Sequence, residues 1–274
     1  VADPRGMQVT VHYSISQLPQ TGYKPRKADD RVGYFLTVSK DFTDNSDDQN
    51  FVRYINRWDL QKADPMAKVS PPKNPIIFHI EKTVPINLRP IVRAGIEEWN
   101  KAFEKLGFDN AVEVRQQRDE DMWDPEDVNY NTFRWITAEA GFAMGPSRVN
   151  PLTGQILDAD IIFDASFLRS WKTSYENFTP SAIASLLDIE QPRGASGAGI
   201  VGPHHSRHAE CRLNEGMQHQ TSLAAAVFAA QGLNAKRGEL PEEFLQQALK
   251  EVVMHEVGHT LGLRHNFKAS AWKT

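Results

Sequence analysis

The most constraining feature of this 274-residue sequence is an amphipathic pattern close to its C-terminal end. Leu and Val recur every four residues from Leu245 to Leu261, which predicts a helix over about 241–263 with one side in the core. Beside this apolar row lie His255 and His259, one helical turn apart, so that both imidazoles can reach a single ion. The sequence therefore predicts a core-packed helix that carries a metal-binding face.

Three further residues extend this pattern at fixed spacings: Glu256, Gly262 and His265. Gly262 allows the chain to leave the helix in a sharp turn, so that His265 can swing back as a third ligand. Three neutral imidazoles leave a coordination position open, as expected of catalytic rather than structural zinc. Zinc-bound water would attack a carbonyl, with Glu256 as the general base that passes the proton to the leaving amine. The alternative, three surface histidines around a helix end, leaves the spacing of Glu256 and Gly262 unexplained.

Patterns in the rest of the chain predict a mixed α+β architecture in two parts. Residues 1–65 form a β-rich region with strand-like runs at 8–15 and 31–38, and four prolines within 61–75 mark a boundary before a second part at 75–274. The elements predicted in this second part are a strand at 76–80, a helix over 87–107, strands at 111–114 and 130–137, a hairpin of 141–145 with 156–163, and helical segments over 165–240.

Composition excludes several classes of function. The net charge is −4, which gives no basic field for nucleic acid, and no run approaches the roughly 20 apolar residues of a membrane span. A single cysteine, Cys211, excludes an internal disulfide framework. The first residues do not resemble a secretory signal and include no initiator Met, so we expect a piece of a longer chain.

Residues 255–265 resemble the metzincin signature His-Glu-x-x-His-x-x-Gly-x-x-His at every fixed position. The wider chain resembles a bacterial family of large, extracytoplasmic zinc-dependent metallopeptidases with poorly characterised flanking regions. The stretches that carry this wider resemblance are 29–35, 99–104, 130–136, 141–160 and 255–270.

The resemblance implies both a site and a fold. It implies that His255, His259 and His265 bind zinc and that Glu256 is the general base. It also implies the upper metzincin subdomain, a twisted mixed sheet with a long backing helix and the active-site helix. The edge strand of that sheet binds extended substrate by strand addition. Residues 157–163 are one candidate for this edge, and the other consists of Gly141, Phe142, Ala143, Met144 and Gly145.

The sequence departs from metzincins after the third histidine. Metzincins place a methionine-containing turn beneath the zinc, but the nine residues after His265 contain no Met. We therefore expect the C-terminal subdomain to be absent here and the remainder of a longer chain to be a partner. Asn266 is a second departure, because better-known subfamilies use other residues there.

The predicted function is a zinc-dependent endopeptidase that acts on protein or peptide substrates and is extracytoplasmic: periplasmic, cell-surface or secreted. The alternative is a non-catalytic, or truncated and inactive, binding module on a metzincin scaffold. A third hypothesis is hydrolysis of a non-peptide amide or a peptidoglycan crosslink. The presence of Glu256 favours an enzyme, because a recognition site has no need of a base there.

Weaker signals leave alternatives open. Cys211 could be a thiolate that occupies zinc or a small buried residue. Asp158, Asp160 and Asp164 could bind calcium or be hydrogen-bonded carboxylates. A second metal site or a solvated loop would explain the cluster of His204, His205 and His208.

Overall fold

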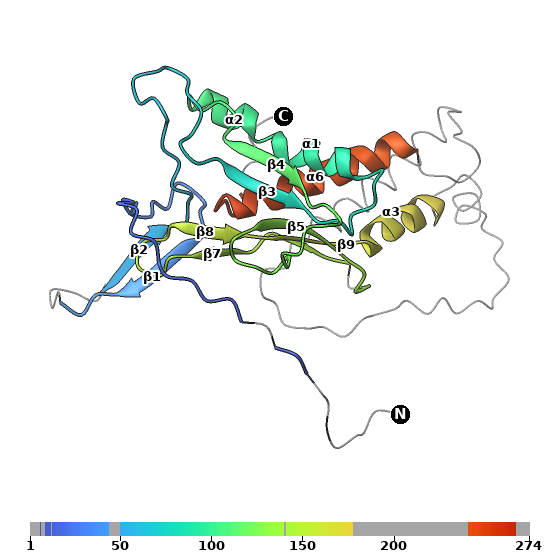
Figure 1. Cartoon of the computed structure of the whole chain (residues 1–274), viewed down its shortest axis with the longest axis horizontal. Helices are drawn as coiled ribbons and strands as arrows, with labels where there is room; N and C mark the ends of the chain where they lie inside the picture. Colours follow the sequence, from blue (N-terminus) through green and yellow to red (C-terminus); the bar gives the residue numbers. More distant parts are fainter. Residues whose placement is uncertain are drawn as a thin grey trace, which may run out of the picture.

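The computed structural model describes residues 6, 9–11, 13–43, 50–139, 141–177 and 241–266, with residues 174–177 described by their backbone alone. Figure 1 shows the chain as a mixed sheet covered by helices, with a two-stranded ribbon projecting at one end. The strands are β1 Leu36–Lys40, β2 Phe51–Ile55, β3 Ile76–Ile80, β4 Val112–Gln116, β5 Asn131–Ile136, β6 Ala143–Met144, β7 Ser147–Val149, β8 Ile156–Ala159 and β9 Ile161–Asp164. The described helices are α1 Arg89–Glu97, α2 Asn100–Lys105, α3 Ser166–Asn177 and α6 Glu242–Thr260.

The main sheet has five strands in the order β4-β3-β5-β9-β6. All neighbours are parallel except β6, which pairs antiparallel with β9. In β3, Ile76, Phe78 and Ile80 alternate into the core, as expected for a strand with helices on one face. The predicted mixed α+β class is therefore correct, and the β3 strand begins where the sequence predicts it.

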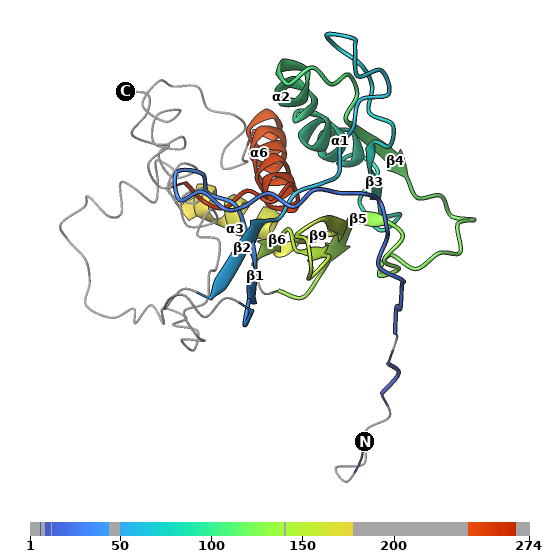
Figure 2. The same ribbon diagram turned by 90° about the vertical axis from the view of Figure 1, so that its left-hand side faces the viewer.

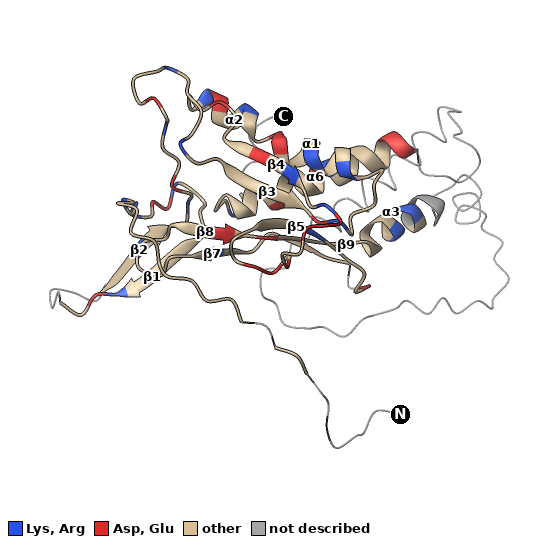
Figure 3. Cartoon of the chain, viewed as in Figure 1, with Lys and Arg blue, Asp and Glu red and all other residues tan. Residues whose placement is uncertain are grey.

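Helices α1 and α6 pack against each other beside the sheet, as Figure 2 shows. Gly95 of α1 makes their close approach possible, because a Cβ atom there would lie 2.8 Å from Val253 of α6. The predicted helix over 87–107 is divided into α1 and α2. Between them Glu98 binds Lys250 of α6 at 2.8 Å and Lys101 of α2 at 2.5 Å. Acidic and basic residues are interspersed along these helices (Figure 3).

The predicted strand at 8–15 is wrong for the residues that are described. Residues 9–11 and 13–15 are not in a strand, and the side chain of Ile15 is 92% exposed. An alternating run forms a strand only when it pairs with a neighbouring strand and packs one of its faces. Among the described residues, neither a pairing strand nor a packing surface is present for this run. In the second run a turn closes at Val32, whose N–H donates to the Asp29 carbonyl, and β1 begins only at Leu36.

The predicted hairpin of 141–145 with 156–163 is correct in its antiparallel pairing, since Ala143 pairs with Phe163, but wrong in its turn. The turn at 150–154 joins β7 to β8 instead, in a separate two-stranded sheet. The run at 156–163 is divided between β8 and β9, and β9 lies inside the main sheet between β5 and β6. Residues 157–163 therefore do not form an edge strand of the main sheet, whereas Ala143 and Met144 do.

Several predictions fall outside the described residues: the segments after α3 up to 240, Cys211, and His204, His205 and His208. The placement of a domain boundary within 65–75 stays a prediction. Among the described residues, no helix is both long enough and apolar enough to cross a membrane.

Candidate metal centre

Helix α6 is the element that presents the candidate ligands. It begins after Pro241 with Glu242 and Glu243 in its first turn, where carboxylates oppose the positive end of the helix dipole. Its buried side includes Leu249, Val253 and Val257, as the four-residue spacing predicts. Nineteen residues of helix thus hold His255 and His259 against a rigid core.

The three predicted histidine ligands converge. Nε2 of His265 lies 3.0 Å from Nε2 of His255 and 3.1 Å from Nε2 of His259. Nitrogens bound to one tetrahedral zinc at about 2.0–2.1 Å would be roughly 3.3 Å apart. Within the described part of the chain, these three residues form the sole cluster of potential metal ligands. The donor set and its spacing therefore fit a zinc ion.

Local contacts prepare these imidazoles to bind metal. Nδ1 of His259 lies 2.8 Å from the Leu263 carbonyl oxygen, which can only accept, so Nδ1 carries a proton and Nε2 is the nitrogen available to a metal. Burial, followed by the charges of His259 and His265, lowers the pKa of His255 to about 4. Burial and His259 lower the pKa of His265 as well. Both groups are thus neutral at neutral pH, as metal ligands must be.

Glu256 lies in α6 directly after the first histidine, and only 1% of it is exposed. The backbone N–H of Gly145 donates a hydrogen bond to its carboxylate, whereas its Oε2 atom has no partner among the described residues. Burial raises the pKa of Glu256 to about 7, although the Gly145 hydrogen bond acts in the opposite direction. A carboxyl group with this pKa can both take up and release a proton near neutral pH.

Comparison with known families agrees with this geometry at the C-terminal end. Residues 237–274 match a family model described as Met-zincin. The resemblance to metzincins is confirmed. Residues 2–63 match a second model, described as a domain of unknown function (DUF5117). No curated protein and no solved structure matches the chain.

The metzincin-like helix lies beside the sheet edge that was predicted to bind substrate. Strand β6 is at this edge, and Gly145 is the residue after it. Gly145 lies so close to α6 that a Cβ atom there would be 2.4 Å from the Glu256 carbonyl oxygen. The other predicted edge residues have partners: the Phe142 carbonyl accepts from the Asp164 N–H, and the Gly141 N–H donates to Ser166 Oγ. Together with the five-stranded mixed sheet, this arrangement fits a metzincin-like fold.

The metzincin-like site also includes contacts that the sequence did not reveal. The ring of Phe35 meets the His259 imidazole edge-on, with centroids 5.8 Å apart. The N–H of Gly145, a residue that stays predicted to contact substrate, also donates to the Glu256 carboxylate. No periodicity signals either contact, because each joins residues far apart in the chain.

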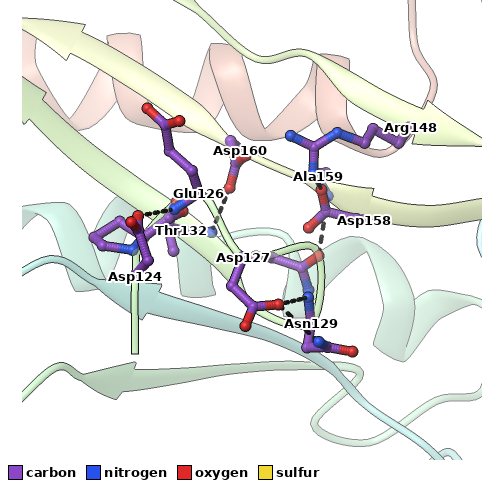
Figure 4. Close-up of polar contacts among 11 residues, drawn as sticks. Asp124, Glu126, Asp127, Asn129, Thr132, Arg148, Asp158, Ala159 and Asp160 are labelled. Carbon is purple, nitrogen blue, oxygen red and sulfur yellow. Dashed lines mark hydrogen bonds and ion pairs between the residues drawn. The ribbon is translucent and has the colours of Figure 1, made fainter. Parts of the chain in front are cut away.

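The aspartates near the β7–β8 hairpin are hydrogen-bonded carboxylates. Asp160 accepts hydrogen bonds from the N–H and Oγ1 of Thr132 at 3.0 and 2.7 Å, and Asp158 forms an ion pair with Arg148 (Figure 4). Asp164 accepts from the Ser166 N–H. These partners favour hydrogen-bonded carboxylates over a calcium site, and the described aspartates form no cluster of potential metal ligands. Of the buried oxygens of these aspartates, Oδ1 of Asp158 alone has no partner among the described residues.

Proposed function

We propose that this chain is a zinc-dependent endopeptidase of the metzincin type. The convergence of three Nε2 atoms, with separations of 3.0 and 3.1 Å, is the observation that carries the proposal. Three neutral nitrogen ligands leave a fourth tetrahedral position for water or substrate, which distinguishes catalytic from structural zinc sites. The buried carboxyl group of Glu256 adds a base that a purely structural site does not need.

Each residue of the site has a distinct role in this proposal. His255, His259 and His265 would hold the zinc ion. The chemistry that zinc supplies when bound is Lewis acidity, which makes water nucleophilic near neutral pH and polarises a substrate carbonyl. Glu256 accepts the proton of the attacking water at Oε2 and returns it to the amine that leaves. The Gly145 N–H keeps the carboxylate oriented for both transfers.

An extended peptide is the substrate that best suits the neighbouring sheet edge. Phe142 faces β9, since its carbonyl accepts from Asp164, and backbone groups alternate sides along an antiparallel strand. The backbone groups of Ala143 therefore point away from β9, and no described strand pairs with that side of β6. A peptide added there would run beside α6 and its histidines. An extracytoplasmic location remains a prediction from the family resemblance.

Cleavage of a quenched fluorescent peptide tests the proposal. The unaltered chain should contain about one zinc, should lose activity with a chelator and should regain it with added Zn²⁺. Glu256→Gln should lower kcat by about 10²- to 10⁴-fold without loss of zinc, because a general base contributes about this much. Glu243→Gln, an exposed change in the first turn of the same helix, is the matched control.

Two outcomes would contradict the proposal. Zinc binding without cleavage of any peptide would favour the binding module on the metzincin scaffold. Full activity in Glu256→Gln would remove the assigned base and with it the mechanism.

A further inference from the structure

A short antiparallel pairing joins the N-terminal region to the turn between the second and third histidines. The N–H of Phe35 donates to the Gly262 carbonyl at 2.8 Å, and the N–H of Arg264 donates to the Gly33 carbonyl at 3.0 Å. Between these bonds Tyr34 is opposite Leu263. Residues 33–35 lie within the span that matches the domain of unknown function, whereas their partners lie in the Met-zincin span.

Two neighbouring residues of the N-terminal region strengthen this attachment. The indole N–H of Trp58 donates to the Thr260 carbonyl at 2.9 Å and so provides a partner for a carbonyl at the helix end, where no later helical N–H is available. Gly262 has a φ of +94°, and a Cβ atom there would lie only 2.1 Å from the Asn56 carbonyl oxygen. The N–H of Asn56 in turn donates to the Phe35 carbonyl. Thr260, Gly262 and Arg264 are thus each held by the N-terminal region.

A side-chain contact links the same segment to a ligand. The ring planes of Phe35 and His259 are inclined at 63°, an edge-to-face arrangement that aromatic pairs prefer. Because 39% of Phe35 remains exposed, burial in the core does not explain its position. The ring of Phe35 therefore restrains the orientation of the His259 imidazole. A second restraint comes from the Leu263 carbonyl, which holds Nδ1 of the same ring.

We propose that residues 33–35, with Phe35 as the principal side chain, position the metal ligands; this inference rests on the proposed function. The turn after α6 is closed by bonds from the Gly262 and Leu263 N–H groups to carbonyls of the helix. The next N–H, that of Arg264, donates to Gly33 instead, and His265 follows it directly. Pairing with residues 33–35 fixes that turn before metal arrives, so the ordering of the third ligand does not oppose binding. Groups that orient ligands in this way commonly change metal affinity when they are altered.

Binding of Co²⁺ to the metal-free chain tests this inference, because its visible spectrum reports the geometry of the ligands. Phe35→Leu keeps an apolar side chain but removes the ring, and should weaken Co²⁺ binding about threefold to tenfold, as the loss of one aromatic contact predicts. Phe35→Tyr keeps the ring and should bind like the unaltered chain. Phe51→Leu is the matched control, since Phe51 is 44% exposed in the same region but contacts Lys40 and Arg53 rather than a ligand.

The thermal midpoint of each metal-free variant separates positioning from general destabilisation. Weaker binding and an altered spectrum in Phe35→Leu alone, with a midpoint like that of Phe51→Leu, would support the inference. Equal affinity and identical spectra in Phe35→Leu, Phe35→Tyr and the unaltered chain would overturn the positioning role and leave the metal centre intact. Failure of the unaltered chain to bind Co²⁺ would instead overturn the three-histidine centre and this inference together.

Discussion

Gly262 combines two requirements at one position. Its φ of +94° lies in the region that favours glycine, and the Asn56 carbonyl oxygen occupies the space of a Cβ atom. The sequence pattern indicated a sharp turn after the helix, which accounts for the first requirement. The second arises from the N-terminal region, so this glycine both ends the helix and admits the segment that holds the turn.

Gly262→Ala should therefore destabilise the chain by about 2 kcal/mol or more and sharply reduce its zinc content, because backbone strain and a steric conflict act together. Thermal unfolding and metal analysis measure the two effects. Gly22→Ala isolates the strain, since Gly22 has a φ of +70° but nothing within 4 Å of its Cβ position. Equal losses of stability and zinc content in Gly262→Ala and Gly22→Ala would show that the steric conflict with the Asn56 carbonyl does not affect either quantity.

Glu256 shows how the surroundings of a side chain set its chemistry. A carboxyl group in water would be fully ionised at neutral pH, but burial raises the pKa of Glu256 to about 7. The spacing of the motif identified Glu256 from the sequence. Its environment depends on Gly145, the residue that follows β6 and donates to the carboxylate.

At the scale of elements, α6 and β6 differ in how far local pattern determines them. Helix α6 is encoded by an apolar row over nineteen residues and agrees closely with the prediction. Strand β6 has only two residues. It lies at the edge because β9, its one partner in the main sheet, pairs with β5 on the opposite side. A two-residue strand carries too little periodicity to define its own register.

Ala143→Pro tests the role of the β6 edge. Proline removes the N–H group that points away from β9, so we expect KM for peptide substrates to rise about fivefold to tenfold, the effect of one lost hydrogen bond, with a smaller change in kcat. Ala143→Ser keeps the N–H and should leave KM unchanged. Steady-state kinetics on both variants make the comparison, and an unchanged KM in Ala143→Pro would exclude strand addition at this residue.

At the scale of the whole molecule, a buried carboxyl group links stability to pH. Burial, then the charge of Asp160, raises the pKa of Asp158 from 3.8 to about 7, although Arg148 and the Ala159 N–H act in the opposite direction. The folded state therefore holds a proton that the unfolded state releases above about pH 4. This contribution to stability is present at low pH and is lost as the pH rises from about 4 to about 7.

Asp158→Asn should flatten the pH dependence of the free energy of unfolding over this window, because the linked proton is removed. His255 contributes with the opposite sign: its pKa is lowered to about 4, so its contribution is present above about pH 6.5 and is lost as the pH falls. His255 is present in both the unaltered chain and Asp158→Asn, so the difference between their free energies of unfolding isolates the contribution of Asp158. Denaturant unfolding of the metal-free forms from pH 4 to pH 8 measures it, and parallel curves would contradict the assignment.

The sequence by itself determined the helix and its chemical face. Apolar side chains every four residues, two histidines one turn apart and a glycine at the helix end are local relations, and a helix imposes them through its own hydrogen bonds. The three candidate ligands and Glu256 could therefore be predicted without any knowledge of the remaining chain.

Only the tertiary structure decided what surrounds that face. The pairing of residues 33–35 with 262–264, the place of β9 inside the sheet and the hydrogen bond from Gly145 to Glu256 join residues that are distant in sequence. Many backbone groups could satisfy each of these bonds equally well. The choice among them is made by packing of the whole core, which no local period records.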